Sequence, residues 1–301
     1  GFDMHHGIHS SYQYFCVWLQ RHNHRLYRKL LNVCKSNDLW WNFEEALAFV
    51  DRDYMLNAAE IWLPSAWDED KDSVADLYYA EDMARNLGTD LWEDIVKAFR
   101  NWVTTIRWEK ESNKRKLRID SEARFINFNY TTFLESQYGI QSSQILYIHG
   151  RQSSKKNPPI IGHGDVDTFK GWYKHTSRHN KQYYRSSKKF LPEVEMMTSS
   201  FEEYFELSEK PVVQIISKNK DFIDDLYDIV HIYVLGHSLN AVDLPYFQVI
   251  KAANDFPSAI NWHISYYSEL EKARLFNTYR AHLSSDDTKV DMFKLEDMMM
   301  C

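Results

Sequence analysis

Short apolar runs of four to seven residues alternate with longer amphipathic segments after residue 118. The runs that we interpret as strands are 125–128, 145–148, 229–235, 260–266 and 290–295. The intervening segments that we interpret as helices are 130–138, 201–228, 243–254 and 268–282. Strands that alternate with helices indicate a parallel α/β sheet. Some runs are nearly apolar throughout, which is typical of strands covered on both faces.

Residues 12–115 have a different pattern, in which apolar side chains recur every three or four positions. The clearest example runs from Trp92 to Ile106 and predicts one buried face of a helix. Aromatic stripes of this kind pack in a core far more often than they bind a cofactor. We therefore expect one α/β domain over 1–301, with a helical insertion at 36–118 and a basic, lid-like loop region at 151–200.

Polar residues directly follow three of the predicted strands: Asn129 the first, His149 the second and 236–238 the third. Ligands bind outside the carboxyl ends of parallel strands, so these residues outline one site. The amide of Asn129 suits ribose hydroxyls or an attacking water, although it also suits a helix cap. His149 has the side chain most often used as a general base, although a lone histidine at a strand end is more often structural.

The residues next to these strand ends are candidates for contact with a ligand. Gly150 and Gly236 leave room for a ligand to approach the backbone. Ser238 is placed to bind a phosphate. Asp243 either binds a hydroxyl or, more simply, caps the helix predicted at 243–254.

The first seven residues, Gly1–Gly7, have the composition of a tight turn between a strand and a helix. A glycine there lets the backbone approach a phosphate, and a helix is predicted from Ser10 onward. No strand precedes this turn in the sequence, so we expect further residues upstream of Gly1 that form a central strand. The alternative is an ordinary glycine at a chain end.

The composition is globular, with 44% hydrophobic and 26% charged residues. No apolar run approaches the roughly 20 residues that span a bilayer, so we expect no membrane partner. The three cysteines contain no C-x-x-C pair, which argues against a disulfide framework and a zinc ribbon and favours the cytoplasm.

Charge is distributed unevenly along the sequence. The net charge is −7, yet residues 151–190 hold ten Lys or Arg against two Asp, a local charge of +8. Aromatic residues are interleaved with these cations. The combination is typical of a nucleic-acid or anionic-ligand site, and also of a solvated surface loop.

The motifs, taken together and in order, resemble those of the AbiH family of bacteriophage abortive-infection proteins. The matching segments are Gly-Phe-Asp-x-x-His-Gly at 1–7, Trp-Asn-Phe-Glu at 41–44, Phe-Asn-Tyr-Thr at 128–131, Ile-His-Gly at 148–150, Ile-Gly-His-Gly at 161–164 and Gly-His-Ser-Leu-x-x-x-Asp at 236–243. Members of that family normally carry a strand and Gly-Asn before Gly-Phe-Asp, in line with the expected upstream strand.

The AbiH family is in turn similar to the sirtuin-type nucleotide-binding superfamily, whose defence enzymes hydrolyse NAD. The resemblance implies a Rossmann-like (sirtuin-like) parallel sheet flanked by helices, NAD as the substrate and no metal. It implies Asn129 and His149 as the catalytic residues. The nucleotide-binding positions that it implies are Gly1, Phe2, Asp3, His6, Tyr130, Thr131, Gly150, Gly236, His237, Ser238 and Asp243.

Our leading hypothesis is therefore an antiviral protein of the bacterial cytoplasm that hydrolyses NAD to nicotinamide and ADP-ribose. The expected partners are an unknown phage-derived trigger and either further copies of the chain or a second defence subunit; a nucleic acid would bind through 151–190. One alternative is a nucleotide-binding sensor without catalysis. The other is a metal-dependent phosphoesterase or nuclease, with Asp3, His5, 162–165 and His237 as ligands. Glu44 either faces the site or, by default, lies on an exposed helix face.

Overall fold

The computed structural model describes residues 2–34, 39–51, 82–83, 85–108, 116–164, 201 and 203–299. The chain divides into two compact units. Unit 1 comprises Gly1–Ser11, Val103–Pro159 and Pro211–Cys301, and unit 2 comprises Tyr12–Trp102 and Ile160–Lys210. The single domain over 1–301 and the insertion at 36–118 stay predictions. Within the lid-like region, 165–200 lies outside the described residues.

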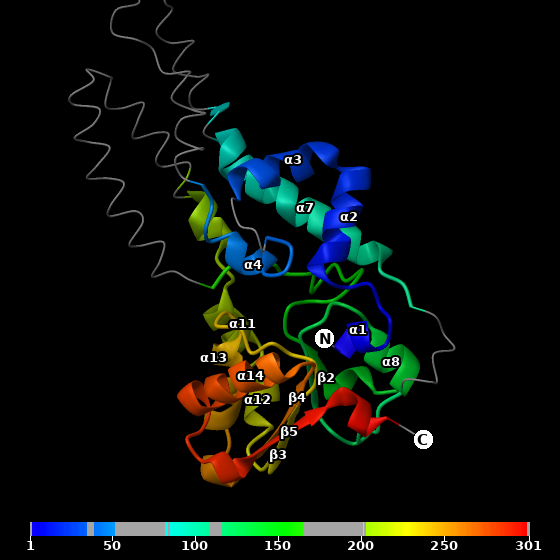
Figure 1. Ribbon diagram of the computed structural model, residues 1–301, viewed down its shortest axis with the longest axis vertical. Coiled ribbons are helices and arrows are strands. Elements are labelled where there is room, and N and C mark those ends of the chain that lie inside the picture. Colours follow the sequence, from blue (N-terminus) through cyan, green and yellow to red (C-terminus); the bar gives the residue numbers. More distant parts are fainter. Residues whose placement is uncertain are drawn as a thin grey trace, which may run out of the picture. The chain divides into compact units, whose positions relative to one another are not determined.

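Unit 1 contains the strands, and all of their pairings are parallel. They are β1 (Phe125–Asn127), β2 (Ile145–Tyr147), β3 (His231–Val234), β4 (Asn261–Tyr266) and β5 (Val290–Lys294). The five predicted strands and the parallel α/β class are thus confirmed. The one sheet that we expected is divided, because the described strands form the separate sheets β1-β2 and β3-β4-β5 (Figure 1). The finer Rossmann-like or sirtuin-like fold stays a prediction, as does a strand upstream of Gly1.

The helices of unit 1 follow the predicted segments, except that α1 lies where a turn was expected and the segment 201–228 is interrupted twice. They are α1 (Phe2–His5), α8 (Phe133–Tyr138), α11 (Val212–Lys218), α12 (Lys220–Asp224), α13 (Leu244–Ala252) and α14 (Glu269–His282), with the short 3-10 helices η2 (Ser142–Gln144), η3 (Pro257–Ala259), η4 (Asp287–Lys289) and η5 (Leu295–Met298). The helix predicted over 201–228 is interrupted at Pro211, which lacks a backbone N–H, and again at Asn219, whose side chain donates to the carbonyl of Ile215.

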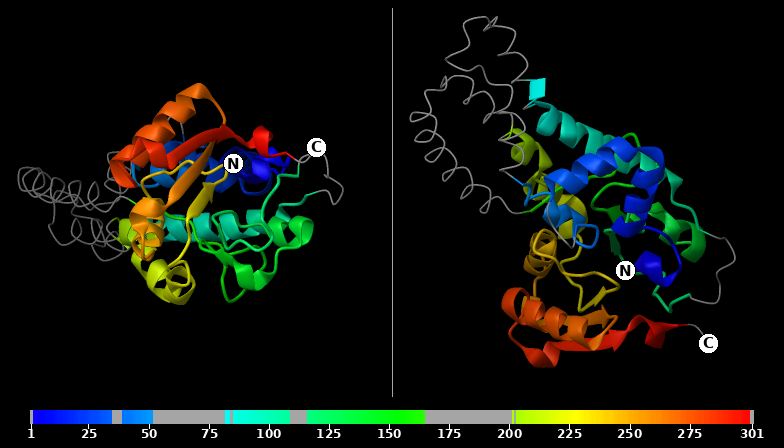
Figure 2. Two further views of the ribbon diagram at one scale, coloured as in Figure 1. Left: turned by 90° about the horizontal axis from the view of Figure 1, so that it is seen from below. Right: turned by 45° about the horizontal axis from the view of Figure 1, so that its top comes forward.

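The core of unit 1 lies on one face of the β3-β4-β5 sheet. Successive strand residues point to opposite faces, so Val234, Trp262 and Ile264 share a face and pack against Leu275 and Tyr279 of α14. Figure 2 shows α14 alongside β4 from a second direction. Because alternate side chains of β3 are exposed, the expectation that such strands are covered on both faces is wrong for β3.

Unit 2 is helical in its described part. Its helices are α2 (Tyr12–His22), α3 (His24–Val33), α4 (Phe43–Ala46) and most of α7 (Thr89–Thr105). Phe15 is fully buried, and its ring lies 5.6 Å from the rings of Phe43 and Phe99 and 5.2 Å from that of Trp102. The aromatic stripe is thus a packed core, as predicted. No helix in the described part of either unit is both long and apolar enough to cross a membrane.

Candidate functional site

The ends of β1 and β2 lie side by side in unit 1. Asn127 is paired with Tyr147 in the parallel register of the two strands. Asn129 and His149 each come two residues after that matched pair. A parallel ladder keeps equal steps along both strands, so the two candidate catalytic residues leave the sheet at the same edge, as predicted.

The turn that carries Asn129 is organised by a buried neighbour, Asn127. The side-chain oxygen of Asn127 accepts a hydrogen bond from the backbone N–H of Asn129 at 2.9 Å, and its amide nitrogen donates to the carbonyl of Thr131 at 3.3 Å. The half-buried side chain of Asn129 makes no hydrogen bond within the described residues, so its amide is available to a ligand. A helix cap is excluded for it, because α8 begins only at Phe133 and its N-cap position is Thr132.

A carboxylate lies between the two candidate histidines. The Oδ1 atom of Asp243 is 3.3 Å from Nε2 of His149, and its Oδ2 atom is 3.3 Å from Nε2 of His237. All three side chains are largely buried, with His149 only 4% exposed. The structure thereby joins the end of β2, the end of β3 and the start of α13. Asp243 occupies the N-cap position of α13 but makes no side-chain cap hydrogen bond, so the simpler capping interpretation is wrong.

Aromatic rings surround this group of histidines. The ring of Phe128 lies 4.3 Å from that of His237 and 5.4 Å from that of His149. The ring of Tyr246, which is fully buried, lies 5.5 Å from His149. Phe128 is also stacked parallel to Phe247 of α13 at 5.4 Å. These contacts limit rotation of both imidazoles and exclude water from one side of the site.

The strand end after β3 is shaped by Gly236, whose φ is +62°. Its backbone N–H donates to Oγ of Ser265 at 2.7 Å, and that hydroxyl donates to the carbonyl of Val234. Glycine adopts this left-handed conformation without steric cost. Ser238, proposed as a phosphate ligand, is half-buried and makes no hydrogen bond within the described part of the chain.

The room beside Gly150 is used by the protein itself. A Cβ atom there would lie 2.1 Å from the carbonyl oxygen of Pro158, and φ at this residue is +79°. We expected this glycine to make room for a ligand, but the backbone of Asn157 and Pro158 fills the space. The loop after β2 is also joined to the turn after β1, because the N–H of Gln152 donates a hydrogen bond to the carbonyl of Tyr130 at 2.7 Å.

Asp3 from the first segment reaches the same turn. Its Oδ2 atom accepts a hydrogen bond from the hydroxyl of Thr131 at 2.8 Å, and the residue is only 2% exposed. Burial raises the pKa of Asp3 from 3.8 to about 6, and the hydrogen bond from Thr131 partly offsets this. Phe2 is buried beside it, while Gly1 lies outside the described residues.

The raised pKa of Asp3 predicts a pH dependence of folding stability. A buried carboxyl with a pKa above its unfolded value stabilises the fold below about pH 4, and this contribution is lost as the pH rises through about 6. About two pKa units correspond to at most about 3 kcal/mol. Asp3→Asn should therefore flatten the decline in the free energy of unfolding between pH 4 and 7, measured by urea unfolding. The exposed Asp255→Asn serves as the control, and an unchanged decline in Asp3→Asn would contradict the assignment.

Both ring nitrogens of His6 make hydrogen bonds within the protein. Its Nδ1 lies 2.9 Å from the carbonyl of Phe2 and must therefore donate, which leaves Nε2 to accept from the hydroxyl of Tyr138 at 2.7 Å. The oxygen of Tyr138 in turn accepts from the N–H of Leu117. This chain of hydrogen bonds fastens α1 to α8, an arrangement that supports the turn at Asp3.

The residues of the metal hypothesis that the structure describes are not gathered into a ligand set. Among the described residues, no group of three or more His, Cys, Asp or Glu could hold a metal ion. His163 belongs to unit 2, where its N–H donates to the carbonyl of Ser208 and its carbonyl accepts from the N–H of Lys210. Asp165 lies outside the described part.

Glu44 also belongs to unit 2, and its default interpretation is wrong. Its carboxylate oxygens lie 3.0 and 3.1 Å from Nζ of Lys210, whose side chain is fully buried. The side chain of Glu44 itself is only 16% exposed. It is therefore one half of a buried ion pair.

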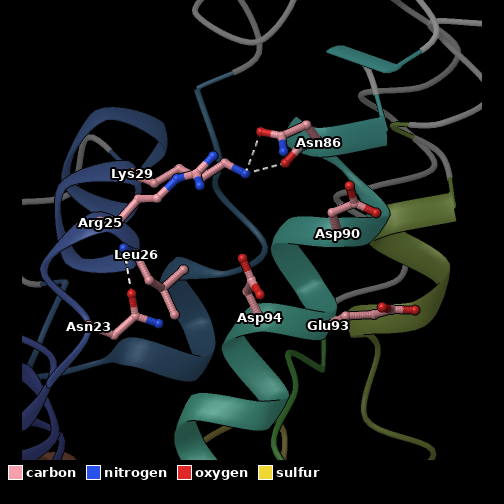
Figure 3. Close-up of a pocket in the computed structure, with 8 residues that line it drawn as sticks. All are labelled: Asn23, Arg25, Leu26, Lys29, Asn86, Asp90, Glu93 and Asp94. Carbon is pink, nitrogen blue, oxygen red and sulfur yellow. Dashed lines mark hydrogen bonds between the residues drawn. The ribbon is translucent and has the colours of Figure 1, made fainter.

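A surface hollow of about 260 Å³ lies in unit 2 between α3 and α7 (Figure 3). Its lining residues are Asn23, Arg25, Leu26, Lys29, Asn86, Asp90, Glu93 and Asp94. The ammonium of Lys29 already donates to Oδ1 of Asn86 at 2.9 Å, and burial lowers its pKa while Asp94 and Asp90 oppose that shift. The hollow contains no predicted site residue, and its charged residues come from both α3 and α7.

Three residues of the site were missed in the sequence. Asn127, Phe128 and Tyr246 carry the turn and the aromatic surroundings, yet they looked like ordinary members of a strand or an amphipathic helix. The available signal was position alone, because Asn127 and Phe128 directly precede Asn129 and Tyr246 follows Asp243 by three.

A family model described as bacteriophage abortive infection AbiH matches residues 1–266. No curated protein and no solved structure matches the chain significantly.

Proposed function

Because the chain belongs to the bacteriophage abortive infection AbiH family, we propose that it defends bacteria against phage by binding NAD and hydrolysing it. The expected setting is the bacterial cytoplasm, where a phage-derived trigger would start the reaction. Further copies of the chain or a second defence subunit are the proposed protein partners.

The convergence of His149, Asp243 and the turn of Asn129 at the carboxyl ends of parallel strands carries this proposal. A buried imidazole beside a carboxylate is suited to accept a proton. The side-chain amide of Asn129, which makes no hydrogen bond within the described residues, is suited to bind a ribose hydroxyl or a water. Together these groups are suited to bind the ribose of a nucleoside and to activate the water that attacks it.

The proposed reaction breaks the bond between the anomeric carbon of the ribose and the nicotinamide nitrogen. The bonding electrons stay with the nicotinamide ring, which leaves neutral, and the sugar passes through an oxocarbenium-like state. Water adds to the anomeric carbon, and its proton goes to His149 and then to solvent. The products are nicotinamide, ADP-ribose and one proton, so atoms and charge balance.

The rest of the nucleotide is assigned to the flanking strand ends. On one side, Tyr130 and Thr131 lie in the turn after β1, and Thr131 donates a hydrogen bond to Asp3 of α1; on the other side, Gly236 and Ser238 follow β3. Left-handed backbone at Gly236 resembles the bends that present N–H groups to phosphates. His237 supports this side through Asp243.

The test is incubation of the purified chain with NAD, with and without extract from phage-infected cells. We expect nicotinamide and ADP-ribose in equal amounts, unaffected by a chelator. Binding of NAD without nicotinamide release would indicate the sensor hypothesis instead. Cleavage of a phosphodiester that a chelator abolishes would indicate the metal-dependent alternative, and a panel of other nucleotides tests the choice of NAD.

A further inference from the structure

We infer that Asp243 is a positioning residue that holds the protons of both histidines on Nε2 and so makes Nδ1 of His149 the atom that accepts a proton. The inference deepens the proposed function and rests on it for its catalytic consequence. Its structural part concerns only where two protons lie, and this can be measured without any substrate.

The tautomer of His237 follows from its hydrogen bond to the backbone. The N–H of Leu239 points to Nδ1 of His237 at 2.9 Å. Because a backbone N–H only donates, Nδ1 must be the unprotonated acceptor, and the ring proton is on Nε2. That nitrogen faces Oδ2 of Asp243 at 3.3 Å. Leu239 has a φ of +50°, unusual for leucine, so the turn that aims this N–H is a constrained one.

The second oxygen of the same carboxylate imposes the same tautomer on His149. The Nε2 atom of His149 lies 3.3 Å from Oδ1, which is within ion-pair range but outside hydrogen-bond geometry. Because an ionised carboxylate only accepts, it favours the tautomer that carries the ring proton on Nε2. The distance is slightly longer than an ideal hydrogen bond, as catalytic contacts often are before a ligand binds. With its Nε2 protonated, the neutral ring has its basic lone pair on Nδ1.

Energetics favour this arrangement over a simple helix cap. Asp243 is 8% exposed, and burying a carboxylate is costly unless it is paired. Two imidazole rings, each with its Nε2 atom 3.3 Å from a separate oxygen, supply that pairing, whereas no side-chain cap hydrogen bond is formed at the start of α13. When His149 takes a proton and becomes charged, the adjacent carboxylate stabilises the imidazolium, as carboxylates do in other histidine-based sites.

The test uses histidine labelled with nitrogen-15 and long-range proton–nitrogen correlation spectra, which report the tautomer of each ring. The chain has 13 histidines, and the signals of these two rings are identified by their loss in His149→Gln and His237→Gln. We expect the Nε2–H form for both rings in the wild-type chain. A predominant Nδ1–H form of either ring would overturn the inference, whatever the protein does with NAD.

Kinetics test the catalytic consequence. Asp243→Asn should lower kcat for NAD hydrolysis by roughly tenfold to a hundredfold with little change in KM, because orientation rather than binding is lost. The control is Ser268→Ala, which removes a real N-cap, that of α14, and should leave kcat unchanged. Normal kcat in Asp243→Asn with an active wild type would refute the positioning role alone. An inactive wild type with the expected tautomers would refute the proposed reaction alone.

Discussion

Replacement of His149 with alanine should lower NAD hydrolysis by roughly a hundredfold to ten-thousandfold, the range expected when a positioned general base is lost. His149 leaves β2 beside the turn of Asn129 and is held by the carboxylate of Asp243 and the ring of Tyr246. The other imidazole of this group, His237, follows β3, whereas His149 follows β2, the strand that is paired with β1. The measurement is nicotinamide release by the activated protein.

Asn129→Ala should cause a loss of similar size, because the proposed base and the group that orients ribose or water act as one unit. The double variant should then be little worse than either single one. His237→Ala should matter less, since its neighbours Gly236 and Ser238, rather than its side chain, are proposed to hold the nucleotide. His231→Ala, an exposed histidine of β3, is the matched control and should retain full activity. Near-normal turnover in His149→Ala would defeat the mechanism.

The strands and their chemistry could be predicted because both depend on local sequence. Val234 and Ile264 belong to apolar runs that need burial, and polar residues directly after such runs must leave the sheet at its carboxyl edge. For the same reason Asn129 and His149 could be placed together before any contact was known. The division of the strands into two small sheets was not predictable, since strand pairing depends on residues far apart in sequence.

Contacts between distant residues account for the remaining errors. Asp243 looks like a helix cap locally, and only the fold brings it to His149, 94 residues earlier in the sequence. Gly150 shows the converse. Its local sequence suggested room for a ligand, but the backbone of Pro158 fills that space. In unit 2, Glu44 has the spacing of an exposed helix residue, and its partner Lys210 is 166 positions away.

That ion pair leads to the largest stability effect that we expect. Lys210 is 2% exposed, its N–H holds the carbonyl of His163, and its ammonium lies against Glu44. Glu44→Gln removes the negative charge while keeping the shape, and so takes the carboxylate of Glu44 away from a buried ammonium. Breaking a buried pair in this way costs about 3 kcal/mol or more of the free energy of unfolding. Urea unfolding of the purified variants measures this loss directly.

A compensating change separates charge burial from simple loss of packing. Adding Lys210→Met to Glu44→Gln removes the buried charge altogether, and the double variant should recover most of the lost stability. The exposed pair of Lys220 and Asp224 gives the matched comparison, because both side chains are more than half exposed. Lys220→Met disrupts this pair and should cost no more than about 0.5 kcal/mol of the free energy of unfolding. If Glu44→Gln cost as little as Lys220→Met, the ammonium of Lys210 would have to be stabilised by other groups, and the pair with Glu44 would not be what holds this part of unit 2 together.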